Sequence, residues 1–289
     1  MAMSGGWLPR SMRRSFGIRP TAGSPPMHGE NVAAAAATSV DDMGSCDHQF
    51  QWAQDLVDFL EQASVRLCVR GEGEDINLRS VASKNYELVR RGRFQHLEDG
   101  DAPKEVSLDT RGWPNRTHMA PPTLRRLQPR FSTTRLSVAN IDTASALRAL
   151  HERGPGGAEP VALNFANARQ PGGGYLNGAR AQEEDLCRLM PPLFNSLKRL
   201  KYPIAVDAAH YTHTLLCRAS GNYQLTSPLR VALISAAMPD LKVERRLAHD
   251  EAAWAETVST RIRTVLATAR EEGHTSLVLG ALGRGGVPH

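Results

Sequence analysis

The second half of the sequence alternates short apolar runs with segments of helical periodicity, and no other feature restricts the fold as strongly. The apolar runs have the composition of buried strands, and they occupy residues 160–165, 212–218, 229–235 and 276–280. Between them, the apolar spacing predicts helices over 143–152, from about Ala181, and around Trp254 to Ala269. This alternation predicts an α/β fold in which helices cover a mostly parallel or mixed central sheet.

The first half of the sequence is less regular. Helical spacing begins at Asp47 and continues over residues 47–63, and a second helix is predicted over 79–91, where Gly92 would end it. Residues 104–108 and 134–140 alternate as short strands do. Asp142 is placed to cap the helix that follows.

Residues 1–45 differ in composition from the rest of the chain. They are rich in Gly, Pro, Ala, Ser and Arg, which predicts either a disordered segment or an organelle targeting segment. We therefore expect three regions, namely residues 1–45, a helical accessory region over 46–120, and an α/β domain over 121–289.

The stretch between Asp109 and Asp142 concentrates positive charge without any acid. Its six arginines are Arg111, Arg116, Arg125, Arg126, Arg130 and Arg135. Two interpretations fit this pattern, a solvated loop and a lip that attracts a phosphate-rich ligand. The net charge of +5 is compatible with a polyanionic partner but does not require one.

Composition limits the cellular context. No run of about 18 apolar residues occurs, so we expect no transmembrane helix and a soluble intracellular protein. The cysteines lack the spacing of a zinc site and are too few for a disulfide framework, which favours a reducing compartment. They are Cys46, Cys68, Cys187 and Cys217.

Three consecutive glycines, Gly172 to Gly174, follow the predicted strand 160–165. Residues without a Cβ let a ligand approach the backbone closely and let N–H groups turn toward an anion, and a helix that starts nearby adds the positive end of its dipole. The segment lacks the Gly-Lys-Ser/Thr of a Walker loop and the GxGxxG of a Rossmann loop, so both are disfavoured. A tight turn from strand to helix is the alternative.

Two adjacent carboxylates, Glu183 and Glu184, come shortly after the glycines. Adjacent helical residues diverge by about 100°, so these two cannot flank one bond from opposite sides. We expect one to act at the reacting bond while the other holds a hydroxyl or a loop; alternatively, both only stabilise a helix N-terminus. Cys187 is expected to be a packed thiol, and His210 and His213 are expected to be structural.

The order GGG, seven residues, QEE resembles the signature of poly(ADP-ribose) glycohydrolases, which are enlarged macrodomains. The stretch "LNFANARQPGGGYLNGARAQEEDLCR" at 163–188 is similar to the pattern "LNFA…PGGG…GA.AQEE.LCR" of the microbial-type group, and "ISAAMPDL" at 234–241 and "LVLGALGRGG" at 277–286 resemble two further segments of that group. The resemblance extends from about Asp47 to His289. It implies a macrodomain-like three-layer α/β/α sandwich with a mixed sheet and an amino-terminal helical extension. The implied activity is hydrolysis of the ribose–ribose bonds of poly(ADP-ribose), with release of ADP-ribose.

The resemblance also implies a role for each matching residue. Glu184 would be the catalytic acid/base, and Glu183 would hold ribose hydroxyls. The other matches would bind the substrate or support its loops: Asn167 at the ribose, Gly172, Gly173 and Gly174 at the diphosphate, Gln182 behind the glycine loop, and Gly283 and Gly285 in a second phosphate loop. No metal or cofactor is implied. The expected partners are poly(ADP-ribose) and ADP-ribosylated proteins, with no direct readout of nucleic acid, no membrane contact and a monomeric chain.

The sequence departs from the family pattern at two places. It stops at His289, a few residues into the second phosphate loop, so we expect a truncated carboxyl end, and Val287 stands where an aromatic residue usually stacks on adenine. Pro191 and Pro192 should end or kink the catalytic helix at Met190. Three alternatives therefore stay open: an ADP-ribose-binding macrodomain without turnover, a hydrolase of mono-ADP-ribosyl proteins, and a chain that does not fold alone.

Overall fold

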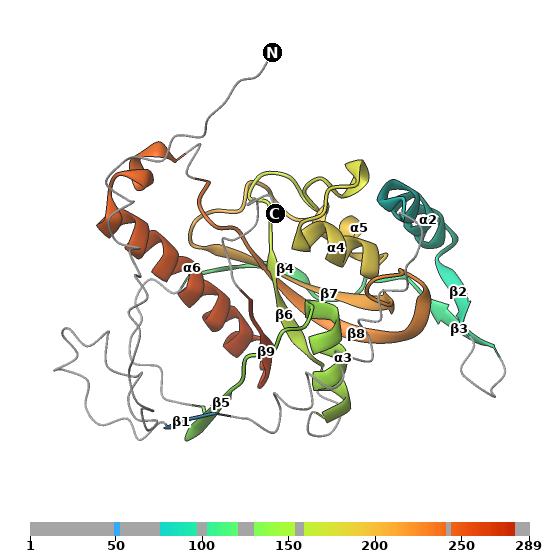
Figure 1. Ribbon diagram of the computed structural model, residues 1–289, viewed down its shortest axis with the longest axis horizontal. Helices are drawn as coiled ribbons and strands as arrows, with labels where there is room; N and C mark the ends of the chain where they lie inside the picture. The colour runs from blue at the N-terminus through green and yellow to red at the C-terminus, as the bar shows by residue number, and fades with distance from the viewer. Residues whose placement is uncertain are drawn as a thin grey trace, which may run out of the picture. The chain divides into compact units, whose positions relative to one another are not determined.

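A mixed sheet of five strands forms the centre of the computed structural model, which describes residues 49–52, 76–96, 103–120, 130–153, 159–240 and 244–280 (Figure 1). The strands lie in the order β4 (Asn115–Met119), β7 (Ala208–Arg218), β8 (Leu225–Ala236), β6 (Val161–Phe165) and β9 (Leu277–Val278). The pairs β4–β7 and β7–β8 are antiparallel, whereas β8–β6 and β6–β9 are parallel. The predicted mixed sheet is therefore confirmed.

Helices cover both faces of this sheet, because alternate residues of the buried strands point to opposite sides. On β6, Ala162 packs into one core cluster, while Val161 and Leu163 pack into another. The first cluster contains residues of α2 (Leu78–Arg91), α3 (Thr143–Arg153), α4 (Gln182–Leu189) and α5 (Leu193–Leu197). The second contains Val265 and Ala269 of α6 (Glu251–Glu271). The result is the three-layer α/β/α sandwich (Figure 1).

Smaller elements complete the described part of the chain. The antiparallel pair β2 (Arg93–His96) and β3 (Lys104–Ser107) packs on α2 through Phe94, Leu108 and Leu88. The parallel pair β1 (Gln49–Trp52) and β5 (Thr133–Leu136) forms a separate two-stranded sheet. Two short 3₁₀ helices are η3 (Tyr175–Asn177) and η4 (Arg245–Ala248). None of the helices in the described ranges is long and apolar enough to cross a membrane.

Several local predictions are confirmed by hydrogen bonds at helix ends. Gly92 ends α2 with a φ of 73°, and its N–H donates to the carbonyls of Leu88 and Val89. Asp142 Oδ1 accepts hydrogen bonds from the Ala144 N–H at 2.9 Å and the Ser145 N–H at 3.0 Å, as an N-cap does. Helix α4 ends at Leu189, and its C-cap Met190 directly precedes the two prolines.

Two predictions from local pattern are wrong. Residues 49–52 belong to the expected helix 47–63. They form β1 instead, because their backbone pairs in register with β5. Residues 53–63 lie outside the described ranges. The strand expected over 134–140 ends at Leu136, so Val138 lies beyond it and is exposed.

The arginine-rich stretch is not simply a loop, because it contains β4, an edge strand held by main-chain pairing with β7. Arg111 pairs with Asp109 at 2.7 Å, and Arg116 bonds to Glu272 at 2.7 Å through its Nε. Arg125 and Arg126 lie outside the described residues. Strand β4 lies before the boundary that we expect near residue 120. The proposed division into three regions stays a prediction, and so does the character of residues 1–45.

Candidate active site

The glycine loop connects β6 to η3 and α4, beyond the carboxyl end of a parallel strand, where α/β proteins usually bind ligands. Gly172 and Gly173 have φ values of 70° and 52°, which glycine adopts without strain. A Cβ on Gly173 would lie 2.4 Å from Oε1 of Glu184, and one on Gly172 would lie 2.7 Å from the Phe194 ring. The loop therefore requires glycine because α4 and α5 lie directly against it.

Glu183 is anchored through both of its carboxylate oxygens. Its Oε2 accepts a hydrogen bond from the Asn167 N–H at 2.8 Å. Its Oε1 accepts from the Gly172 N–H at 3.2 Å and from Asn164 Nδ2 at 3.4 Å. The side chain is 2% exposed, and this burial raises the pKa of Glu183 to about 7, although the three hydrogen bonds act in the opposite direction.

Glu184 is anchored through only one oxygen. Its Oε1 accepts a hydrogen bond from the Gly174 N–H at 2.8 Å. Its Oε2 is buried and has no hydrogen-bond partner among the described residues. Buried polar atoms are nearly always bonded in native structures, so this oxygen has hydrogen-bonding capacity left for a water or a substrate atom. The two adjacent glutamates thus differ, as the helical geometry predicts: Glu183 holds the loop, and Glu184 offers a free oxygen.

Gln182 links α4 to the end of β6. Its Oε1 accepts from the Phe165 N–H at 2.8 Å, and its Nε2 donates to the Leu163 carbonyl at 2.9 Å. Through these two bonds, the Gln182 side chain pairs with the backbone of β6 as a neighbouring strand would. Nε2 also contacts Thr143 Oγ1 at 3.2 Å, which connects α4 to α3. The position of Glu183 and Glu184 relative to the strand is fixed by this side chain.

The N–H groups of the glycine loop are all bonded within the chain. Those of Gly172 and Gly174 donate to the two glutamates, and that of Gly173 donates to the Gln170 carbonyl at 3.0 Å. A diphosphate at this loop would therefore contact other atoms or replace these bonds, and the diphosphate contact stays a prediction. Gly283 and Gly285 lie outside the described residues.

Asn167 shapes the loop as well as reaching the site. Its exposed side chain accepts hydrogen bonds from the N–H groups of Arg169 at 2.9 Å and Gln170 at 3.0 Å, an Asx turn that reverses the chain before the glycines. Its own N–H donates to Glu183. The role at the ribose that the resemblance implies for this residue stays a prediction.

Two residues behind the glutamates, Asn164 and Ser235, are not among the site residues predicted from the sequence. Both are 0% exposed, and Asn164 Nδ2 donates to Ser235 Oγ at 2.9 Å as well as to Glu183. They lie opposite each other in the parallel pair β6–β8. The available signal was a polar amide inside the apolar run 160–165, because a buried strand carries such a group only when it has a partner.

Cys187, His210 and His213, which we expect to be structural, are packed or paired within the chain. Cys187 is 0% exposed within the core, and burial raises the pKa of its thiol well above the ordinary range. His210 Nδ1 lies 2.8 Å from Thr117 Oγ1, and His213 pairs with Glu159. Within the described ranges, no group of three His, Cys, Asp or Glu residues could hold a metal ion.

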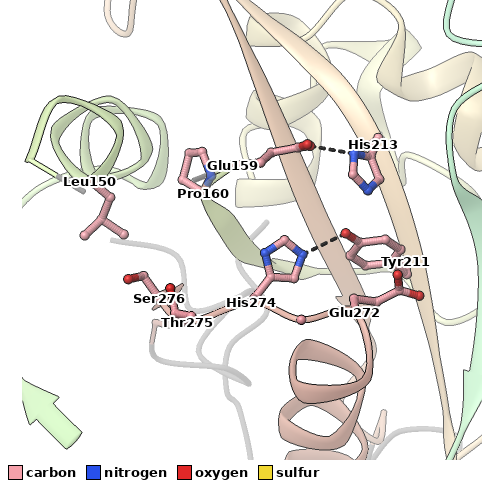
Figure 2. Close-up of a pocket in the computed structure, with 10 residues that line it drawn as sticks. Leu150, Glu159, Pro160, Tyr211, His213, Glu272, His274, Thr275 and Ser276 are labelled. Carbon is pink, nitrogen blue, oxygen red and sulfur yellow. Dashed lines mark hydrogen bonds and ion pairs between the residues drawn. The ribbon is translucent and has the colours of Figure 1, made fainter. Parts of the chain in front are cut away.

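A separate pocket of about 300 Å³ lies at the other end of β6 (Figure 2). It is lined by Glu159 and Pro160 before β6, by Tyr211 and His213 of β7, and by residues 272–276 after α6. Two pairs of its polar side chains are bonded to each other: Tyr211 Oη contacts His274 Nε2 at 2.7 Å, and His213 pairs with Glu159 (Figure 2). The free carboxylate oxygen of Glu184 belongs to the opposite end, which we take as the candidate active site.

Fold and site together define a macrodomain-like α/β/α protein with a glutamate-bearing helix beneath a glycine loop. The family model for the catalytic domain of microbial-type poly(ADP-ribose) glycohydrolase (PARG) matches residues 82–226, and the chain belongs to this family.

Solved structures of PARG from Thermomonospora curvata are similar to the chain. One is 30% identical, with a TM-score of 0.57, and the match covers 72% of this chain and 80% of that one. Another, bound to the inhibitor ADP-HPD, is 27% identical with the same coverage and a TM-score of 0.51. No curated protein matches the chain.

Proposed function

We propose that this chain hydrolyses the ribose–ribose O-glycosidic bonds of poly(ADP-ribose) and releases ADP-ribose. Membership of the microbial-type PARG family supports this activity. The single observation that carries the assignment of roles is the asymmetry of the glutamate pair: Glu183 is bonded through both oxygens, while Glu184 keeps one oxygen without a partner in the described chain.

In the proposed mechanism, Glu184 acts as both acid and base. Protonated Glu184 donates its proton to the leaving ribose oxygen as the bond from that oxygen to the anomeric carbon breaks. The carboxylate so formed takes a proton from water, and the water oxygen bonds to the anomeric carbon. The net reaction adds one water across the glycosidic bond. The Gly174 N–H holds Oε1, so the free Oε2 is the atom that exchanges the proton.

Glu183 supports the reaction in two ways. Its Oε2 accepts a single hydrogen bond from the chain, so a lone pair is left for a ribose hydroxyl. In the ionised form of Glu183, its negative charge, together with the substrate's own diphosphate, stabilises the positive charge that develops on the ribose. The proposed substrate contacts of Asn167, Gly172, Gly173, Gly174, Gly283 and Gly285 complete the site, with Gln182 behind the loop.

The proposed partners are poly(ADP-ribose) and ADP-ribosylated proteins, and the proposed working form is a monomer inside the cell. Neither a metal ion nor a cofactor takes part in the proposed steps. The proposed catalytic region begins near residue 121, with residues 46–120 as an accessory region.

The decisive experiment measures ADP-ribose release from purified poly(ADP-ribose) by the parent chain and by Glu184→Gln. Loss of the acid/base is expected to lower release by about 100- to 10,000-fold while ADP-ribose binding persists. Glu251→Gln is the matched control, because Glu251 is an exposed glutamate in the first turn of α6. It should leave release unchanged.

Other outcomes of this experiment identify the alternatives. A folded parent that binds ADP-ribose without releasing it would be a binding module. Release only from singly modified proteins would identify a mono-ADP-ribosyl hydrolase. Full activity of Glu184→Gln would refute the assigned acid/base.

A further inference from the structure

Asn85 of α2 is a buried amide, 1% exposed, and its side chain lies within hydrogen-bond distance of four groups on other elements, with the two Nδ2 hydrogens shared among three acceptors. Its Nδ2 lies 2.8 Å from the Arg188 carbonyl, 3.2 Å from the Cys187 carbonyl and 3.2 Å from Tyr175 Oη. Its Oδ1 accepts from Arg218 Nε of β7 at 2.8 Å. An amide with this many partners in the core holds them in one geometry.

The partners of Asn85 belong to the two parts of the candidate site. Tyr175 directly follows Gly174, whose N–H donates to Glu184, and the Tyr175 N–H donates to the Gly172 carbonyl at 3.0 Å. The carbonyls of Cys187 and Arg188 lie in the last turn of α4, the helix that carries Glu184. One side chain therefore connects the donor side of the Gly174–Glu184 hydrogen bond to its acceptor side.

The end of α4 needs such a partner. The last carbonyls of a helix have no N–H donor within the helix. Two prolines follow Met190, so residues 191 and 192 cannot supply N–H groups to the carbonyls at the end of α4. Asn85 supplies the missing donor from α2. A second bond, from Arg79 Nε to the Asn177 carbonyl at 3.0 Å, ties the same helix to η3.

We propose that Asn85 is a positioning residue for catalysis: by bonding to Tyr175 and to the end of α4, it fixes the Glu184 carboxylate against the glycine loop. This inference rests on the proposed function of Glu184. It also assigns a task to α2, which lies in the accessory region by our division: the helix completes the active site without touching the substrate. A misplacement of about 1 Å at a reacting group can lower a rate by about 100-fold.

The test compares Asn85→Ala with Leu88→Ala, a matched control on the same helix. Leu88 packs against the apolar cluster that contains Phe94 and Leu108, so its removal weakens the packing of α2 and leaves the Asn85 hydrogen bonds in place. Tyr175→Phe is a milder second variant, because the ring still packs against Phe194 at 5.2 Å while only the hydroxyl is lost. We would measure kcat and KM for ADP-ribose release, normalised to the fraction of molecules that bind ADP-ribose, and amide hydrogen exchange at Gly174.

Asn85→Ala is expected to lower the normalised kcat at least about tenfold while KM changes less than about threefold. Exchange of the Gly174 amide should become at least about tenfold faster. Tyr175→Phe should change both quantities in the same direction but less, and Leu88→Ala should change neither beyond about twofold. Equal normalised kcat and equal Gly174 exchange in Asn85→Ala and Leu88→Ala would overturn the proposal.

The exchange measurement separates this inference from the proposed function. If the parent chain releases no ADP-ribose, the proposed activity fails, and Gly174 exchange still decides whether Asn85 holds the loop against α4. If Asn85→Ala does not fold, Tyr175→Phe decides: unaltered exchange and kcat in that variant would refute the positioning role.

Discussion

Gly173 lies so close to Glu184 that a Cβ on the glycine would come within 2.4 Å of the carboxylate Oε1. The neighbouring Gly174 N–H donates a 2.8 Å hydrogen bond to the same oxygen. The loop and the glutamate are therefore a single unit, and the glycines serve the carboxylate directly as well as any ligand above them.

We predict that Gly173→Ala removes most activity. The new methyl group must displace the Glu184 carboxylate, and the φ of 52° adds strain of about 1 to 2 kcal/mol for a residue with a Cβ. ADP-ribose release should fall about 100-fold. Gly221→Ala is the control, because Gly221 has a φ of 88° and nothing within 4 Å of the added Cβ. It should lose similar stability and keep its activity; equal activity in the two variants would contradict the prediction.

The raised pKa of Glu183 predicts a pH dependence of stability. The pKa is about 7 in the folded chain against an ordinary value of 4.5, so the folded state binds more protons than the unfolded state between these values. The free energy of unfolding therefore decreases as the pH rises through this window, by an amount on the order of 3 kcal/mol for this group. Glu183→Gln lacks the titration.

Denaturant unfolding of the parent and of Glu183→Gln at pH 5 and pH 8 measures this effect. The stability of the variant relative to the parent should increase between the two pH values, since all other groups contribute equally to both chains. A relative stability that does not change with pH would show that Glu183 titrates normally.

Glu272 should matter for stability and not for activity. Burial acts to raise the pKa of this carboxyl, but hydrogen bonds from Arg116 and His118 outweigh it and lower the pKa overall. The ion pairs therefore stabilise the fold at neutral pH, and their contribution is lost as the pH falls through the lowered pKa. Because Arg116 is half-exposed, Glu272→Gln should cost about 1 to 2 kcal/mol at pH 7 and less in acid.

Release of ADP-ribose per folded molecule by Glu272→Gln should equal that of the parent. This comparison also tests the location of the site, because Glu272 lines the pocket at the opposite end of β6 from the glutamate pair. A loss of activity without a loss of folded protein would move the active site to that pocket.

Cys187 and Cys217 should resist thiol reagents in the folded chain. Both are fully buried, and burial raises the pKa of the Cys217 thiol to about 12 and raises that of the Cys187 thiol well above its ordinary value. Labelling with an alkylating reagent, followed by mass spectrometry of peptides, should find these two positions modified only after unfolding. Rapid labelling of Cys187 in native buffer would show that α4 opens readily.

Local sequence determined the parts of this protein whose stabilising interactions are local. The helix over residues 79–91 ends at Gly92 because only glycine adopts that φ freely, and the run 160–165 forms the buried strand β6 because all of its residues except Asn164 are apolar. The glycine loop and the adjacent glutamates were likewise visible as a motif, and their divergence followed from helical geometry alone.

Tertiary structure decided everything that depends on residues far apart in the chain. Residues 49–52 became a strand through pairing with β5, against their helical spacing, and the polar segment β4 joined the sheet because β7 offered it a free edge. Glu183 and Glu184 have the same side chain, and only the positions of the Asn164, Asn167, Gly172 and Gly174 N–H groups decide that Glu183 is bonded through both oxygens while Glu184 keeps one oxygen unpaired within the described residues. Asn85 reaches Arg188 across 103 residues, a contact that no local pattern encodes because hydrogen-bond partners in a core are chosen by packing in three dimensions.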